Sequence, residues 1–370
     1  MIPLHMKAVV KIREGEVRLE TVEVPKPGLG QVLVQVFAAA QNPSDCLFSP
    51  LLIPYYASDN KPLFVGMKLE RSWPEHDVIV GHDFAGVIQE LGPDVSSEFR
   101  KVGQRVAGFL NACVSVEDGG TFAEYCVADA MMLVDLPDSM SFESASTIGL
   151  AAFTACQLLW QNQKLPTPLD ASRYSFPILV WGGASAVGQY VVQLAKQSGL
   201  QVITTASPQN HKLLKKLGAD VVFDYRDPEV VAKIRAFCGG KQLNVAIDCV
   251  SVDRSVTLVT DCVEDCEGSY IALVLPVEIK AKHIKSDFTY VYTLLGKSIS
   301  GKYTYPAIPE HYELGRWSAT LLSHLAKKGV LSTIPTRVVP NGLADAQYWI
   351  NYQEEGKVHA EKIVYRVDPS

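Results

Sequence analysis

Three glycines follow an apolar run near the middle of the chain, within residues 181–188 (WGGASAVG). The apolar run at 178–181 predicts a strand and residues 189–196 predict a helix, so the glycines lie in a tight strand-to-helix turn. Such a turn presents backbone N–H groups and a helix N-terminus to a pyrophosphate, and glycine leaves no side chain in the way. We therefore expect a bound dinucleotide, whose chemistry is hydride transfer. The candidate contacts are Gly182, Gly183, Ser185, Ala186, Val187 and Gly188.

A second apolar run, at residues 201–205, begins about 20 residues after the glycines, where a dinucleotide fold contacts the adenosine ribose. An NAD site usually has Asp or Glu at the end of this strand, but here the strand ends in alanine and Ser207. A small hydroxyl and a nearby cation suit a 2′-phosphate. We therefore expect NADPH, bound by Ser207 and Lys212, with Tyr225 or Arg226 as a further ligand. The alternative is a glycine turn that holds no nucleotide, with Lys212 as a solvated helix residue.

Length and composition are those of an ordinary enzyme. A chain of 370 residues is long enough for two domains, and 48% hydrophobic with 20% charged residues excludes disorder. The net charge of −6 disfavours nucleic acid and anionic membranes as partners. The apolar runs are shorter than the roughly 18 residues of a membrane helix, and the N-terminus lacks the form of a secretory signal, so we expect a cytoplasmic protein. The eight scattered cysteines fit a reducing compartment.

The elements that position these residues fall into three regions. Residues 1–140 are rich in predicted strands. Residues 141–304 open with a helix capped near Ser141 that runs to about residue 154, and then alternate strand and helix, which predicts a parallel sheet. Residues 305–370 supply an amphipathic helix and a last strand at 362–366, which we expect to rejoin the first region. The interpretation is a dinucleotide domain (141–304) inserted into a catalytic domain (1–140) that residues 305–370 complete.

Several motifs occur in order along nearly the whole chain besides the glycine turn. They are GLGQVLV (28–34), NPSD (42–45), GHDFAGV (81–87), VGQRV (102–106) and AEKIV (360–364). In this combination the chain resembles the medium-chain dehydrogenase/reductase superfamily, and most of all its zinc-free quinone-oxidoreductase and enoyl-reductase branch. The resemblance implies an α/β fold: a Rossmann doubly wound parallel sheet plus a GroES-like, strand-rich catalytic domain.

Two shorter segments carry a closer likeness, SPxN at 207–210 and VFDYR at 222–226. With them the chain is particularly similar to the fungal stand-alone enoyl reductases that act in trans for polyketide synthases. This likeness implies NADPH-dependent reduction of an activated carbon–carbon double bond in an acyl-carrier-protein-bound polyketide intermediate. It also adds Asn210 to the candidate cofactor contacts.

The zinc-dependent members of this superfamily hold their metal with a cysteine, a histidine and a further cysteine or carboxylate. In this chain Asn42 stands at the cysteine position, and amides are poor zinc ligands. His82 and Asp83 remain, but one imidazole and one carboxylate do not make an open tetrahedral site. We therefore expect no metal, and we interpret His82 as a hydrogen-bonded structural histidine.

Reduction of an unsaturated thioester without a metal needs hydride at the β-carbon, hydrogen-bond donors for the enolate oxygen and a proton for the α-carbon. The resemblance implies that the loop 42–45 lies beside the nicotinamide, which makes Asn42, Ser44 and Thr154 the candidate catalytic donors. It adds Asp45 and Leu273 as candidate cofactor contacts. For Asn42 and Asp45 a local capped turn is an equal alternative, and for Thr154 helix packing is.

Two departures from the resembling reductases keep other functions open. Leu47 stands where those enzymes have a lysine near the substrate, and residues 46–80 form a longer connection, either a cover for the substrate or a surface elaboration. A second hypothesis is therefore a non-redox cyclase or isomerase of a polyketide-derived intermediate on the same fold. A third is a regulatory protein that binds NADPH.

A carrier-protein partner is acidic and would need a basic patch on this chain. The densest basic cluster is Lys280, Lys282, His283, Lys285 and Lys297, which a solvated surface explains equally well. The apolar segment 269–276 is either a dimer edge strand or a strand closed off by Pro276. We therefore expect a small-molecule or carrier-bound acyl substrate and a possible polyketide synthase partner, in a monomer or homodimer.

Overall fold

The computed structural model describes residues 1–13, 15–45, 51–56, 62–67, 78–112, 119–171, 175–299 and 304–367, without side chains at 51–56, 62–67 and 253. The chain divides into two compact units, Met1–Leu150 with Tyr292–Ser370, and Ala151–Val291. The first unit extends past residue 140 because helix α1 (Phe142–Ala145) packs on strands of that unit, and Glu143 accepts a hydrogen bond from Arg366 (2.8 Å).

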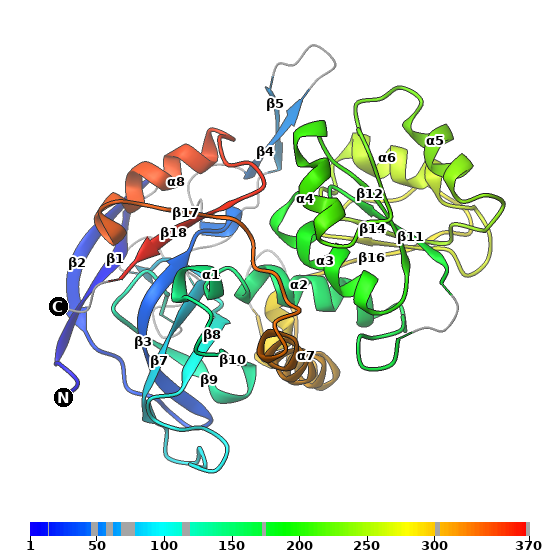
Figure 1. Ribbon diagram of the computed structural model, residues 1–370. Coiled ribbons are helices and arrows are strands. Elements are labelled where there is room, and N and C mark those ends of the chain that lie inside the picture. Colours follow the sequence, from blue (N-terminus) through cyan, green and yellow to red (C-terminus); the bar gives the residue numbers. More distant parts are fainter. Residues whose placement is uncertain are drawn as a thin grey trace. The chain divides into compact units, whose positions relative to one another are not determined.

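The first unit is built on strands that, except for the parallel pair β17 and β18, are antiparallel, and they bring the two ends of the chain together (Figure 1). One sheet has the order β2-β1-β6, a larger one has the order β10-β8-β7-β3-β18-β17 with β9 on β3, and β4 pairs with β5. Strand β18 pairs antiparallel with β3, so the prediction that the last strand rejoins the first region is confirmed. The strands are β1 (His5–Arg13), β2 (Glu16–Glu23), β3 (Gln31–Ala40), β4 (Leu51–Tyr56), β5 (Pro62–Met67), β6 (Val78–Ile79), β7 (Asp83–Leu91), β8 (Arg105–Phe109), β9 (Tyr125–Asp129), β10 (Val134–Asp135), β17 (Thr336–Val338) and β18 (Lys362–Arg366).

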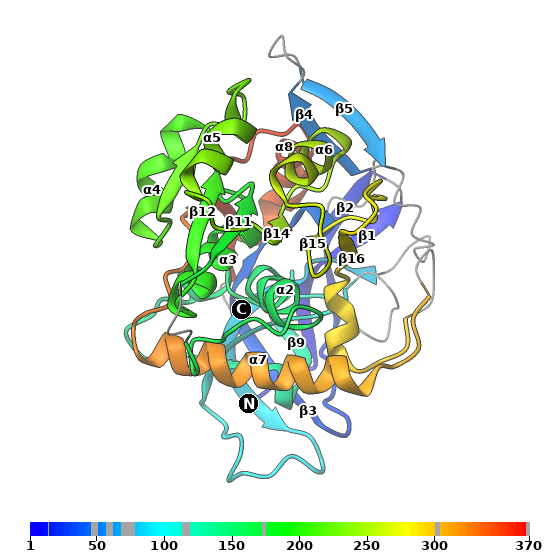
Figure 2. The same ribbon diagram turned by 90° about the vertical axis from the view of Figure 1, so that its right-hand side faces the viewer.

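Short helices and one long helix complete this unit. The predicted amphipathic helix near residues 317–328 is confirmed as α7 (Pro309–Lys327), which Figure 2 shows as one uninterrupted helix. The others are α8 (Ala346–Glu354) and the 3-10 helices η1 (Pro43–Asp45), η2 (Ala130–Met132), η4 (Val291–Leu295) and η5 (Gly342–Asp345).

The helix expected from Ser141 to about residue 154 is divided in two. Ser141 caps α1 as predicted, because its Oγ accepts the Ser144 N–H (3.2 Å). A second helix, α2, then spans Gly149–Trp160. Between them the hydroxyls of Ser146 and Thr147 donate to the carbonyls of Glu143 and Ser144, at 2.8 Å each. Such side-chain bonds compete with helix continuation, so the sequence prediction of one helix was wrong.

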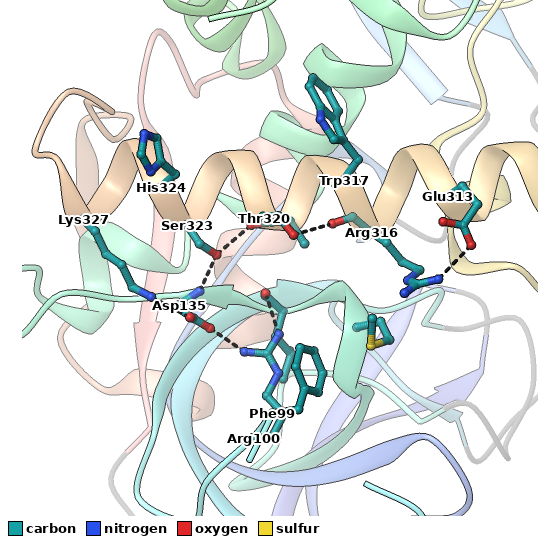
Figure 3. Close-up of a pocket in the computed structure, with 13 residues that line it drawn as sticks. Phe99, Arg100, Asp135, Glu313, Arg316, Trp317, Thr320, Ser323, His324 and Lys327 are labelled. Atoms are coloured by element: carbon teal, nitrogen blue, oxygen red, sulfur yellow. Dashed lines mark hydrogen bonds and ion pairs between the residues drawn. The ribbon is translucent and has the colours of Figure 1, made fainter. Parts of the chain in front are cut away.

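Charged side chains link helix α7 to the strands of the first unit. Asp135 accepts hydrogen bonds from Arg100 and Lys327, and its backbone N–H donates to Ser323 Oγ (2.9 Å). Figure 3 shows Asp135 between those two cations, in a groove of about 590 Å³ beside α7. Burial alone would raise the pKa of Asp135, but the hydrogen bond from Lys327 and the charge of Arg100 outweigh it and lower that pKa. Charged side chains that form ion pairs with one another thus line the groove.

The second unit is a parallel sheet with the strand order β13-β12-β11-β14-β15-β16, which confirms the predicted doubly wound α/β fold. Helices α3 and α4 lie on one side of it and α5 and α6 on the other (Figure 1). The strands are β11 (Pro177–Trp181), β12 (Gln201–Thr205), β13 (Val221–Phe223), β14 (Val245–Asp248), β15 (Tyr270–Leu273) and β16 (Lys285–Phe288). The helices are α3 (Ala186–Gln197), α4 (His211–Lys216), α5 (Val230–Phe237), α6 (Asp253–Cys262) and η3 (Pro208–Asn210).

The segment 269–276 is neither an edge strand nor a strand closed by Pro276. Its strand, β15, pairs with β14 on one side and with β16 on the other. The sequence Lys285-Ser-Asp-Phe288 of β16 is largely polar, and for that reason the hydrophobic pattern did not reveal it. Lys280, Lys282, His283 and Lys285 are exposed, as a solvated surface requires. Within the described ranges no helix is both long and apolar enough to cross a membrane.

Candidate active site

The glycine turn after β11 is shaped by the packing of the protein itself. Gly182 has a φ of +74°, and its N–H donates to Thr205 Oγ1 (3.0 Å). A side chain on Gly183 would overlap Thr204 Oγ1, and one on Gly188 would overlap the backbone at Gly182. Besides leaving room for an anion, these glycines are therefore required by the packing, because larger residues would push strand, turn and helix apart.

The start of α3 offers backbone donors. Ser185 is the N-cap residue, and its Oγ accepts the Gly188 N–H (3.0 Å). The N–H groups of Ala186 and Val187 have no acceptor among the residues that the structure describes. Free N–H groups and the helix dipole at the start of a helix attract a phosphate. This arrangement is the one that the glycine motif predicts for a pyrophosphate.

The predicted 2′-phosphate ligands follow the neighbouring strands β12 and β13. Ser207 Oγ lies 3.5 Å from Tyr225 Oη, and the Asn210 N–H donates to the Ser207 carbonyl (2.9 Å). Lys212, in the first turn of α4, is exposed and has no ion-pair partner in the described part of the chain. The structure thus brings Ser207, Asn210 and Tyr225 together and places Lys212 on the following helix.

Arg226 is less available than Lys212. Its guanidinium bonds Asp224 twice, at 3.0 and 2.9 Å, and lies 5.7 Å from the centre of the Tyr225 ring. The hydrogen bond from Arg226 is the main reason why the pKa of Asp224 is lowered. An anionic ligand of Arg226 would therefore have to compete with an existing carboxylate.

In the first unit the loop after β3 is held by a buried ion pair. Lys362 Nζ lies 2.5 Å from Asp83 Oδ2 and donates to Asn42 Oδ1 (2.8 Å). The Asn42 amide donates in turn to Asp83 Oδ2 (3.0 Å). All three side chains are at most 3% exposed. Both ends of the Asn42 amide are therefore engaged inside the protein, by residues distant in the sequence.

Asp83 also fixes the start of α2. Its Oδ1 accepts the N–H of Leu150 (2.6 Å), so this carboxylate serves as the cap that the helix lacks in its own sequence. A side chain at Gly149 would overlap Asp83 Oδ1. The ion pair of Asp83 with Lys362 thus connects β18, the loop after β3 and the first turn of α2.

His82 and Asp45 lie next to this ion pair. Asp45 Oδ2 accepts the Asn42 N–H (2.6 Å), and Asp45 Oδ1 is 3.5 Å from His82 Nε2. His82 Nδ1 is 2.9 Å from the Leu110 carbonyl, which can only accept, so Nδ1 carries a proton. The Tyr292 hydroxyl is 3.2 Å from His82 Nε2. His82 is fully buried, and its prediction as a hydrogen-bonded histidine is confirmed.

The remaining candidate site residues, apart from those that are not described, lie on separate elements of the structure. Ser44 Oγ is buried and has no hydrogen-bond partner among the described residues. Thr154 is 8% exposed and belongs to the second unit, on α2, and Leu273 is the last residue of β15 and 1% exposed. Leu47 and most of the connection 46–80 lie outside the described residues.

Two features were not predicted from the sequence. One is the buried partner of Lys362, although a lysine inside an apolar strand signals such a partner. The other is the pair Asp248 and Ser251, at and just after the end of β14. The signal there is an aspartate that closes the buried strand VAID. Among the described residues no group of three or more His, Cys, Asp or Glu side chains is placed to hold a metal ion.

Two family models match the chain. The alcohol dehydrogenase GroES-like domain matches residues 28–138, and the zinc-binding dehydrogenase model matches residues 186–297. A trans-enoyl reductase of Alternaria alternata is 33% identical over 368 residues, which cover 99% of this chain and 100% of that protein.

Solved structures agree in fold. The quinone oxidoreductase from Coxiella burnetii aligns with a TM-score of 0.67 and 27% identity, over 98% of this chain and 100% of that one. A mycobacterial protein solved in complex with NADPH aligns with a TM-score of 0.69 and 22% identity, over 98% and 100%. The chain therefore belongs to the trans-enoyl reductase family, within the medium-chain dehydrogenase/reductase superfamily of oxidoreductases.

Proposed function

We propose that this protein reduces the activated carbon–carbon double bond of an enoyl thioester, with NADPH as the reductant and without zinc. The observation that carries this proposal is a set of hydrogen-bond donors and a lysine, at the carboxyl end of the parallel sheet, that can bind phosphate groups. The free N–H groups at the start of α3 suit a pyrophosphate, and Ser207, Tyr225 and Lys212 suit a 2′-phosphate. The absence of an acidic residue at the end of β12 favours NADPH over NADH.

The donor set does not suit zinc. The position of the first zinc ligand in related dehydrogenases holds Asn42, and both ends of its amide are bonded to Lys362 and Asp83. A zinc ion there would face the Lys362 ammonium at close range and would displace the partner of a buried carboxylate. We therefore propose that the reduction is independent of a metal ion.

The residues of the first unit supply positioning and a hydrogen-bond donor. When bound, NADPH supplies the hydride that reduces the double bond. The Ser44 hydroxyl, which has no partner among the described residues, is the donor that we propose for the thioester oxygen. Asn42 and Asp45 hold the loop that carries Ser44, and Thr154 remains a proposed second donor. We further propose the first unit as the catalytic domain and the second as the nucleotide-binding domain, in which Leu273 contacts the cofactor.

The relative from Alternaria alternata is named a trans-enoyl reductase. We propose that the substrate of this chain is held on an acyl carrier protein of a polyketide synthase, in the cytoplasm. The exposed lysines of 280–285 are the basic surface that an acidic carrier would meet.

The second candidate function is a non-redox cyclisation or isomerisation, favoured by Leu47 in place of the lysine of related reductases. The change Leu47→Lys tests the importance of this difference. For a reductase it should raise the rate on a short enoyl thioester, because it restores the lysine that the resembling reductases have near the substrate. An unchanged rate with NADPH still bound would count against the missing lysine as the limiting element.

The cofactor is tested by titrating NADPH and NADH against the wild type and Lys212→Ala. Loss of one charge-assisted contact at an exposed site costs about 1.4 kcal/mol, so NADPH affinity should fall about tenfold while NADH affinity stays the same. The matched control is Lys216→Ala, another exposed lysine on α4. Equal losses for both nucleotides, or an equal loss in the control, would contradict the 2′-phosphate assignment.

A further inference from the structure

Three neighbouring strands of the second unit end side by side at the carboxyl end of the parallel sheet. Trp181, Asp248 and Leu273 are in register as the last residues of β11, β14 and β15. The strand order reverses between β11 and β14, and open α/β sheets bind their ligands at such a switch point. The adenosine contacts follow β12 and β13, and the glycine turn follows β11. The other half of a dinucleotide therefore extends past the segments that follow β14 and β15.

The segment after β14 is held by a cluster of buried hydrogen bonds around Asp248 and Ser251, the Asp248 knot. Asp248 is fully buried, and its Oδ1 accepts the N–H groups of Val250 and Ser251 at 2.9 Å each. Its Oδ2 accepts the hydroxyl of Ser255, at the start of α6 (2.7 Å). Burial raises the pKa of Asp248 to about 6, against the effect of these three donors. A group kept buried at such a cost fixes the backbone around it firmly.

Ser251 is the strained member of this knot. Its φ is +54°, a left-handed conformation that serine rarely adopts. Its Oγ donates to the Asp248 carbonyl (2.8 Å) and accepts the Val274 N–H (2.9 Å). Ser251 thus ties the segment after β14 to the segment after β15. Strained residues that are held by several bonds concentrate at binding and catalytic sites.

The tied segments lie against the glycine turn. The Val250 side chain occupies the space that a side chain on Gly182 would need. Val250 and Val274 are partly exposed, whereas Asp248 and Ser251 are fully buried. The knot therefore holds two apolar residues, Val250 and Val274, at the carboxyl end of the sheet, beside the proposed pyrophosphate site.

We propose that Ser251, held by Asp248, is a positioning residue that fixes residues 249–252 and 274 as the surface on which the nicotinamide–ribose half of the dinucleotide binds. This inference rests on the proposed nicotinamide cofactor. It differs from a purely structural role, in which the knot serves only to begin α6 through Ser255. A structural role predicts lost stability with all ligands affected alike, whereas the positioning role predicts loss for one half of the cofactor only.

The test compares two ligands on the full chain, NADPH and adenosine 2′,5′-bisphosphate, which has the adenosine and the 2′-phosphate but no nicotinamide. The variant Ser251→Gly relieves the strained φ and removes the hydroxyl that Val274 requires. NADPH affinity should fall about five- to tenfold, the equivalent of one lost hydrogen bond, while affinity for the fragment stays within about twofold. The control Thr260→Ala removes a hydroxyl bond within α6 and should change neither affinity.

A second pair of variants tests the same knot. Asp248→Asn keeps an oxygen that accepts the N–H groups of Val250 and Ser251, so NADPH affinity should be largely retained, whereas Asp248→Ala should lose it about tenfold. Unchanged NADPH affinity in Ser251→Gly, or equal losses for NADPH and the fragment, would overturn the inference. A wild type that binds the fragment but not NADPH would instead refute the proposed cofactor, and so the two failures are distinguishable.

Discussion

Removal of the Lys362 ammonium should destabilise the first unit strongly. In the variant Lys362→Met the apolar part of the side chain is largely kept, but Asp83 loses its cation and Asn42 Oδ1 loses its donor. Asp83 is fully buried and Lys362 is 3% exposed, so water cannot replace the lost partner. Among the residues that the structure describes, the carboxylate then keeps the Leu150 N–H at 2.6 Å and the Asn42 amide at 3.0 Å.

Breaking a buried ion pair from one side costs about 3–5 kcal/mol. The two remaining donors place this case near the lower limit, about 3 kcal/mol. For a folding unit of this size each kcal/mol lowers the melting temperature by about 2–4 °C, so the expected decrease is roughly 6–12 °C.

Thermal unfolding followed by circular dichroism measures this decrease. Lys357→Met is the matched control, because that lysine is exposed and its loss should cost less than about 0.5 kcal/mol. The double variant Lys362→Met with Asp83→Asn should recover part of the loss, since no uncompensated carboxylate remains. A melting temperature for Lys362→Met within about 2 °C of wild type would refute the reasoning that this pair holds the loop.

Two further perturbations follow from the structure. Because the folded-state pKa of Asp135 is lowered, its bonds to Arg100 and Lys327 stabilise the protein fully above the unfolded value of 3.8, and this contribution is lost as pH falls from that value through the lower folded-state pKa. Wild type should therefore melt higher than Asp135→Asn at pH 7, with the difference shrinking as the pH falls below 3.8; a constant difference would contradict this. Gly188→Ala should weaken NADPH binding at least tenfold and lower the melting temperature, because its methyl overlaps the Gly182 backbone; unchanged titration and melting curves would contradict the tight turn.

The parts of the fold that local patterns specify were predictable. The strand, glycine turn and helix around Gly182 were expected from the residue types, and Ser141 was correctly predicted as a cap because its hydroxyl bonds only three residues away. The fold class followed from the alternation of strands and helices and from the family motifs.

Contacts between residues distant in the sequence were not predictable in this way. Asn42 and Lys362 are 320 positions apart, and only the pairing of β18 with the sheet of β3 brings them together. Strand β16 has too few apolar residues for a pattern to mark it. The positive φ of Ser251 has no local signal either, because a glycine usually marks such a position.

The central claim, reduction of an enoyl thioester by NADPH, is tested most directly by one turnover measurement. The purified protein is mixed with NADPH and enoyl-pantetheine thioesters of several chain lengths, and NADPH oxidation is followed by absorbance while product is identified by mass. The proposal predicts one saturated thioester formed for each NADPH consumed. NADPH that binds but is not oxidised with any chain length would contradict it and favour a non-redox function.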